Sequence, residues 1–170
     1  MHADTGFPRA DAENDFLRAR RRQVLASLGH RLRGQPAADR ILPLDEVVAA
    51  LGNRGEQYRG LQTIPLDTIV GTVDSRRDFD RRFRPTSSRV RYRWEQLALA
   101  QRRGQPMPPI EVYRVGGLHF VSDGHHRVSV AAATGQQAID AYVTEVCTAR
   151  RAAGQTWTGP EPVRRAVRAR

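Results

Sequence analysis

The sequence predicts an α+β fold built around a single core. Apolar residues follow helical spacing up to about residue 103, after which short stretches alternate between apolar and polar residues, as strands do. Gly116-Gly117 separates two of these stretches and is typical of a two-residue hairpin turn. At 170 residues, of which 39% are hydrophobic and 27% charged, the chain is long enough for one ordinary domain and too short for two.

Two helices are expected near the start of the chain. The first begins at Asp11, runs to a glycine and proline that end it, and places most of its apolar residues on one side. These residues are Phe16, Leu17, Val24, Leu25, Leu28 and Leu32. The second covers Leu44 to Leu51, with Pro43 at its start and Gly52 just past its end. Residues 1–59 are therefore interpreted as an N-terminal helical extension.

The middle of the chain is expected to contain a turn, a loop and a helix. Pro65 presets φ at the start of a helical turn. Thr72 to Pro85 is polar and rich in Arg and Asp, which is typical of a loop. Thr86 to Arg103 is expected to be a helix with Thr86 or Ser87 as its N-cap. The apolar stripe of this helix, which we expect to face the core, consists of Val90, Trp94, Leu97 and Ala98.

The last expected elements are a hairpin, a helix and a strand. They cover Ile110–Val115, Leu118–Ser122, Gly124–Thr134 and Ile139–Val146. The resulting order is helix, strand, loop, helix, hairpin, helix, strand. It predicts a compact domain over residues 60–147, followed by an Arg-rich tail over residues 148–170 that we expect to be mobile.

The positive charge of the chain is unevenly distributed. The net charge is +10, and all 28 basic residues are Arg because the sequence contains no Lys. Residues 76–103 carry a net charge of +7 and residues 147–170 of +5, whereas residues 109–146 carry −2. A concentrated basic surface is typical of polyanion binding, because each neutralised phosphate releases condensed counterions. The alternative is a solvated surface in a proteome whose codon usage favours Arg.

Composition also excludes several classes of protein. No apolar run reaches the roughly 18 residues of a membrane-spanning helix, so no membrane partner is expected. The first ten residues contain Asp4 and lack the apolar stretch of a secretory signal, which favours a cytoplasmic location. Cys147 is the single cysteine, which rules out an internal disulfide and a zinc site of several cysteines. Without Lys, a Walker-type or Schiff-base lysine is excluded.

The segment from Phe120 to Arg127 is the strongest candidate for a functional site. A strand leads through Gly124 directly into a helix, whose first amides and positive dipole end favour an anion. Gly124 allows a phosphate to approach the main chain, and Asp123 is placed to cap the helix. The side-chain donors of the first turn are His125, His126 and Arg127. The simpler interpretation is an ordinary capped helix with its histidines in solvent.

From Thr63 to Val146 the chain resembles the ParB/sulfiredoxin domain. The hexapeptide Ile64-Pro65-Leu66-Asp67-Thr68-Ile69 is similar to the strand-and-turn start of the ParB N-terminal domain. Arg76, Phe79 and Asp80 fit the Arg-x-x-Phe-Asp element that follows there. Gly124-His125-His126-Arg127 lies where ParB proteins carry Gly-Glu-Arg-Arg, sulfiredoxins Gly-Cys-His-Arg, and the free serine kinases of this superfamily Asp-Gly-His-Thr-Arg. The resemblance covers about half of the chain.

This resemblance implies a nucleotide whose phosphates lie on the loop and helix start at Gly124. It implies that Arg76 or Arg77 approaches the same pocket, and that the ligand is a nucleoside triphosphate, ATP or CTP, with or without Mg²⁺. His125 occupies the sulfiredoxin cysteine position, which argues against cysteine-based sulfinic acid repair. The further motif and helix-turn-helix domain of full-length ParB do not follow in this sequence, so a CTP-gated DNA clamp is not expected.

The function expected from the sequence is that of a ParB-like domain that binds a nucleotide or phosphate within a DNA-associated or regulatory protein. Its Arg-rich flanks would contact DNA or another polyanion, and a homodimer remains open. One alternative is an enzyme on the same fold, an ATP-dependent kinase, phosphohydrolase or nuclease. In that case Asp123 or His126 would act as a general acid or base or as a metal ligand. Another is an interaction domain whose pocket has lost its ligand. No dedicated metal site is expected, because adjacent histidines point in different directions.

Overall fold

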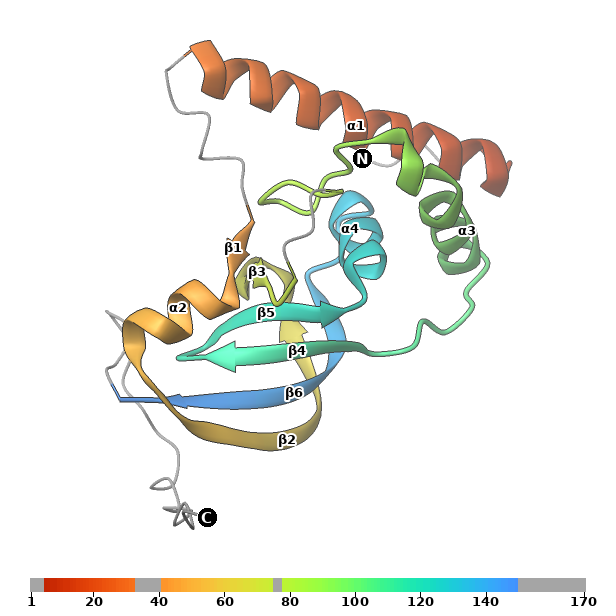
Figure 1. Cartoon of the computed structure of the whole chain (residues 1–170). Coiled ribbons are helices and arrows are strands. Elements are labelled where there is room, and N and C mark those ends of the chain that lie inside the picture. Colours follow the sequence, from red (N-terminus) through yellow and green to blue (C-terminus); the bar gives the residue numbers. More distant parts are fainter. Residues whose placement is uncertain (1–4, 33–40, 75–77, 150–170) are drawn as a thin grey trace.

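Helices cover one face of a curved sheet, and a further helix lies near the hairpin end of that sheet (Figure 1). The computed structural model describes residues 5–32, 41–74 and 78–149. The helices are α1 (Pro8–Leu32), α2 (Leu44–Leu51), α3 (Arg91–Arg102) and α4 (His125–Ala133), with 3-10 turns at Leu66–Thr68 and Ser88–Val90. The strands are β1 (Leu42–Pro43), β2 (Asn53–Pro65), β3 (Ile69–Thr72), β4 (Ile110–Val115), β5 (Leu118–Asp123) and β6 (Ala138–Thr148). These elements confirm the predicted α+β class.

Within the described residues, the strands form one mixed sheet in the order β1-β3-β5-β4-β6-β2. The hairpin β4–β5 and the pair β2–β6 are antiparallel, whereas β1–β3, β3–β5 and β4–β6 are parallel. Thr72 at the end of β3 is in register with Val121 of β5. Because these two strands run in the same direction, both end beside the start of α4, which immediately follows β5. Polar groups from separate parts of the chain therefore meet there.

The main core lies between the sheet and the helices α1, α3 and α4. Trp94 of α3 is fully buried, and its ring contacts Phe16 of α1 edge to face at a centroid distance of 5.5 Å. Its indole Nε1 donates a 2.8 Å hydrogen bond to Ser129 Oγ of α4. Trp94 thus joins the three helices, as expected for the central residue of the stripe. A second, smaller core lies under α2 and contains Phe120 of β5.

The buried side of α1 differs from the predicted one. Leu25 and Leu32 were expected to face the core but are 69% and 89% exposed. The helix also begins at Pro8 rather than Asp11, and its buried residues include Phe16, as predicted, but otherwise differ from the predicted set. These are Asp11, Ala12, Asp15, Phe16, Ala19 and Gln23. The prediction was wrong because two aspartates on the buried side find charged partners on α3, which sequence spacing alone does not reveal.

Most other element predictions are confirmed, with two differences. The helix over Leu44–Leu51, the hairpin, the helix after Gly124 and the last strand are all present. The long strand β2 was not predicted, and the predicted boundary between residues 59 and 60 lies inside it. Most of its side chains are exposed, so it shows little alternation. Ser87 Oγ accepts a hydrogen bond from the amide of Arg89 and caps a 3-10 turn, so α3 begins at Arg91 instead of Thr86.

No helix in the part of the chain that the structure describes is both long and apolar enough to cross a membrane. The predicted tail over 148–170 begins inside β6, which runs to Thr148. Residues 150–170 lie outside the described residues.

Candidate phosphate site at the start of helix α4

The start of α4 depends on the conformation of Gly124. This residue is the N-cap, with φ of 103° and ψ of 19°, and its carbonyl accepts a 3.0 Å hydrogen bond from the amide of Val128. A Cβ atom at this position would lie 2.5 Å from Ile110 Cγ2. Only glycine combines this left-handed backbone with so close a contact. Gly124 itself has no side chain with which to cap the helix.

Asp123 does not cap α4, which corrects the prediction from the sequence. Its carboxylate instead lies 2.5 Å from the Arg127 guanidinium, one helical turn ahead. The reason is that Gly124 takes the N-cap position, which leaves Asp123 as the last residue of β5. A charge-assisted pair with an arginine then stabilises this carboxylate more than a single amide would. The Asp123 side chain remains 63% exposed.

Arg127 connects α4 to the proline-rich segment before β4. Its guanidinium donates a 2.7 Å hydrogen bond to the carbonyl of Pro108 and another to that of Pro109. Together with the ion pair to Asp123, these contacts hold the side chain at the edge of the helix start, with 14% of it exposed. The prediction that Arg127 also contacts a phosphate stays a prediction.

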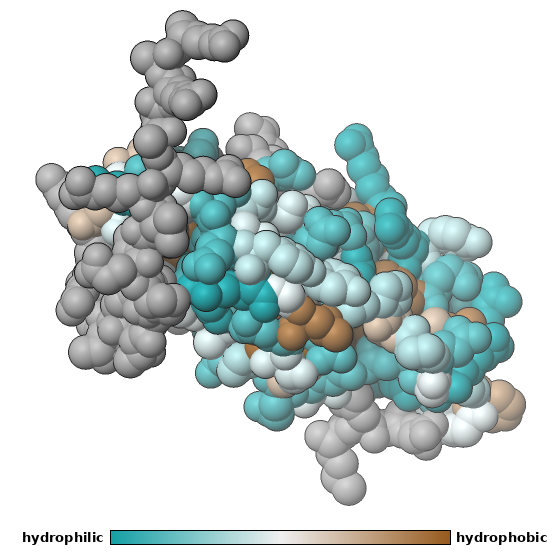
Figure 2. All heavy atoms as spheres, turned by 90° about the horizontal axis from the view of Figure 1, so that it is seen from below, coloured by the Kyte–Doolittle hydropathy of each residue, from teal (hydrophilic) through white to brown (hydrophobic). Residues whose placement is uncertain are grey.

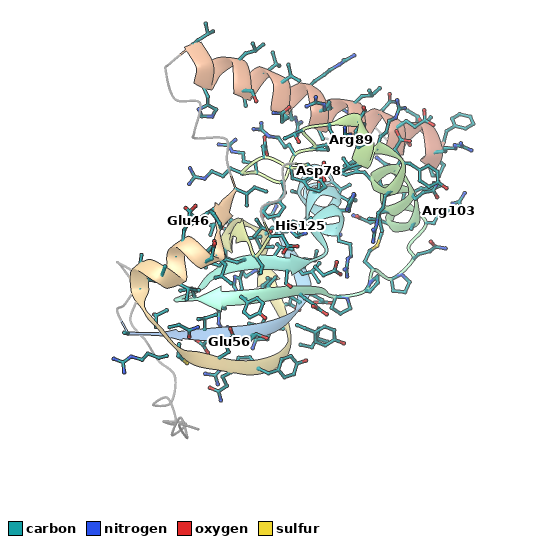
Figure 3. All side chains as sticks on the ribbon, in the orientation of Figure 1. Glu46, Glu56, Asp78, Arg89, Arg103 and His125 are labelled. Atoms are coloured by element: carbon teal, nitrogen blue, oxygen red, sulfur yellow. The ribbon has the colours of Figure 1, made fainter. Side chains whose placement is uncertain are left out.

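His125 is buried and joins α4 to β3. Its Nε2 lies 2.7 Å from Thr72 Oγ1, and the Thr72 hydroxyl in turn donates to the carbonyl of Val121 at 3.2 Å. The imidazole stacks on Phe79 at 6.4 Å with an interplanar angle of 19°, and Phe83 lies 6.1 Å away. Figure 3 shows His125 between the sheet and the loop that carries Asp78. This histidine therefore fixes the position of the loop relative to the helix start.

His126 is half-buried and also contacts this loop. Its ring meets Phe79 edge to face at 5.2 Å, with an interplanar angle of 87°. Both histidines of the motif thus pack on one phenylalanine of the Arg-x-x-Phe-Asp element. The two motifs that the sequence singled out, which are more than forty residues apart, thus meet at Phe79.

Asp80 shapes the loop after Phe79. Its buried carboxylate accepts 2.9 Å hydrogen bonds from the amides of Arg82 and Arg84, and Oδ2 accepts a 2.8 Å hydrogen bond from Arg84 Nε. Phe83 adopts a φ of 55°, which is unusual for a bulky residue and is supported by this network. The role of Asp80 is thus to hold Phe79 in place against the histidines.

The structure brings together part of the predicted site. Gly124, His125, His126 and Arg127 share the first turn of α4, whereas Arg76 and Arg77 lie outside the described residues. Sequence reasoning missed Thr72, because nothing in its local pattern indicates that β3 ends beside β5. Among the described residues, no group of three or more His, Cys, Asp and Glu side chains is placed to hold a metal ion.

A cavity of about 260 Å³ opens next to Arg127, along one side of α4. Gln101 from the end of α3, Met107 from the proline-rich segment and Asp140 from β6 contribute to its walls. The arginine therefore lies between the helix start and a polar space that can accept part of a small molecule.

No protein-family model matches the chain, and no curated protein is significantly similar to it. Among solved structures, a sulfiredoxin from Arabidopsis thaliana is matched with 24% sequence identity. The match covers 49% of this chain and 82% of that chain, with a TM-score of 0.36. This likeness is too distant to assign a family, so the function proposed below rests on the residues of this chain.

Proposed function

We propose that the chain binds a phosphate-bearing nucleotide at the start of α4, as a ParB-like binding domain would. The observation that carries the proposal is the helix start formed by left-handed Gly124 directly after β5, where the N-cap residue has no side chain. The positive end of the helix dipole and the first backbone amides favour an anion, and glycine lets it approach the main chain. The two histidines and Arg127 stand in the same turn and provide polar side chains next to that position.

Arg127 is the side chain that we expect to respond to the ligand. Its present partners are two carbonyls and the exposed carboxylate of Asp123. A phosphate is a stronger acceptor for a guanidinium than an exposed carboxylate that water already solvates, and it fits the same fork of donors. On binding, the Arg127 guanidinium would therefore exchange the carboxylate of Asp123 for a phosphate oxygen of the ligand. The cavity beside Arg127 leaves space for the nucleoside.

The proposal is tested by isothermal titration calorimetry with ATP, CTP, ADP and inorganic phosphate, each with and without Mg²⁺. Arg127→Ala should weaken binding by about tenfold to a hundredfold, because a charge-assisted contact contributes roughly 1.5 to 3 kcal/mol. Arg103→Ala removes an exposed arginine at the end of α3 and should leave the affinity unchanged. Circular dichroism checks that both variants are folded.

Two outcomes of this experiment would contradict the site. The first is an unchanged affinity in folded Arg127→Ala, and the second is the absence of binding by any of the four ligands. A product assay under the same conditions separates binding from catalysis. Release or transfer of phosphate that depends on Asp123 or His126 would favour the enzyme alternative instead.

A further inference from the structure

Tyrosines line a slot on the face of the sheet opposite the site at α4. Tyr58 of β2 and Tyr113 of β4 are both in register with Thr144 of β6, the strand between them. Two strand spacings separate the tyrosine backbones by about 10 Å, and only the short threonine side chain stands between them. Tyr142 precedes Thr144 by two residues on the same face of β6. A flat group can therefore lie between aromatic rings above Thr144.

The slot belongs to a cavity of about 330 Å³. Its polar and aromatic walls come from Tyr58, Glu111, Tyr113, Ser122, Tyr142 and Thr144. Tyr58 is 65% and Tyr142 41% exposed, so the rings are accessible from solvent. Figure 2 views the molecule from the side of β2 and β6, where a small hydrophobic patch is surrounded by hydrophilic residues.

Glu111 gives this cavity a negative charge in a strongly basic chain. It is in register with Tyr142, and in the described part of the chain its carboxylate has no hydrogen bond or ion pair. No basic side chain of the described residues lines the cavity. Asp123, which is in register with Glu111 across the hairpin, is itself paired with Arg127. The cavity thus combines aromatic faces with one unpaired anion.

From this combination we propose that the cavity binds the arginine side chain of a peptide. Aromatic faces attract cations, and the planar guanidinium stacks between rings where a lysine ammonium cannot. The Glu111 carboxylate can accept two parallel N–H donors from its edge. In the described residues β2 is the last strand of the sheet, so its free edge next to Tyr58 can pair with the backbone of an extended peptide. This proposal does not rest on the proposed nucleotide site, although Asp123, which is opposite Glu111 across the hairpin, pairs with Arg127 there.

The test uses the full-length protein and NMR titration of backbone amides with N-acetyl-arginine amide. Its citrulline counterpart has nearly the same shape but no charge, and the lysine counterpart has the charge but no planar group. We expect shifts at Thr144 and Glu111, with arginine binding at least about tenfold more tightly than citrulline or lysine. A short extended peptide with one central arginine should bind more tightly than the amino-acid amide and also shift β2 amides.

Variants separate this site from general charge attraction. Glu111→Gln should weaken arginine binding by about tenfold, while Glu56→Gln, which removes an exposed carboxylate of β2 outside the cavity, should leave it unchanged. Tyr142→Leu should weaken it to a similar extent. Equal binding of arginine and citrulline, equal effects of the two glutamate variants, or shifts at Thr144 caused by ATP rather than arginine would each overturn the proposal.

Discussion

His119 is a titratable residue that the fold buries. It lies on β5 with 4% of its surface exposed, and its Nδ1 is 2.8 Å from Thr68 Oγ1. In the described residues its Nε2 is buried without a hydrogen-bond partner. Burial lowers the pKa of His119 to about 4, and the positive charge of Arg114 contributes to this lowering. The folded protein therefore holds this histidine in its neutral form.

The pKa of His119 predicts a dependence of stability on pH. His119 takes up a proton near pH 6.5 in the unfolded chain but only near pH 4 in the folded chain. The stability that neutral His119 contributes to the folded protein is therefore complete above pH 6.5 and is lost as the pH falls towards 4. At pH 5 the loss should be about 2 kcal/mol. Urea unfolding at pH 7.5 and pH 5 measures it. His119→Gln does not titrate, so its stability should fall less than that of the wild type, and equal losses would contradict the assignment.

A second prediction at the scale of one residue concerns the effect of Gly124 on stability. Gly124→Ala should lower the free energy of unfolding by at least about 2 kcal/mol more than Gly135→Ala. Both glycines flank α4 and have positive φ, but a Cβ at Gly135 meets no atom within 4 Å, whereas one at Gly124 overlaps Ile110. Urea unfolding of the two variants makes the comparison. Similar losses would mean that the close contact at Ile110 relaxes without cost.

Helix α1 is held on the domain by buried charges rather than by an apolar stripe alone. Arg102 at the end of α3 lies 2.5 Å from Asp15 and 3.8 Å from Asp11, and both aspartates are almost fully buried. Asp11 also accepts hydrogen bonds from the backbone and hydroxyl of Thr5. Such buried pairs are tolerated only when both partners are present.

Removal of Arg102 should therefore loosen α1. Arg102→Ala removes the 2.5 Å partner of buried Asp15 and a more distant partner of Asp11, and should cost about 3 kcal/mol of stability. The same substitution at exposed Arg103 should cost less than about 0.5 kcal/mol. Urea unfolding gives the two values, and limited trypsin digestion at Arg18–Arg22 reports on the helix itself. If Arg102→Ala is as stable and as resistant to trypsin as Arg103→Ala, the ion pairs do not hold α1.

Fewer arginines are free to contact a polyanion than the sequence suggests. Within residues 76–103, Arg84, Arg91 and Arg102 form ion pairs with carboxylates. Asp80 and Glu95 are already counted in the +7 of this segment, so among these three pairs only that of Arg102 with Asp15 of α1 lowers its charge. Figure 3 shows Arg89 and Arg103 at separate ends of the 3-10 turn and α3 region. A polyanion would rely more on the Arg-rich C-terminal sequence than on this helix.

We therefore predict that the C-terminal arginines dominate the salt dependence of DNA binding. Replacing Arg164, Arg165, Arg168 and Arg170 by Gln should make the slope of log K against log salt shallower, by up to about 0.9 for each phosphate that is no longer neutralised. Fluorescence anisotropy with duplex DNA over a range of salt measures the slope, and nucleotide affinity should stay unchanged. If the unmodified protein does not retain DNA even at low salt, the charge is only a solvated surface.

The sequence by itself determined the elements that local chemistry specifies. Gly116-Gly117 predicted the hairpin, Pro43 and Gly52 bounded α2, and the stripe centred on Trp94 predicted the buried side of α3. Each of these signals acts within a few residues, through backbone conformation or helical spacing. The strand, glycine and helix around Gly124 were predictable for the same reason, because they follow one another directly along the chain.

Tertiary structure alone decided which distant groups meet. The buried side of α1 depends on Arg102, eighty-seven positions after Asp15, and the position of His125 depends on Thr72 and Phe79. Packing and charge pairing act through space, so they remain invisible in a linear pattern until the sheet brings β3, β5 and α4 together.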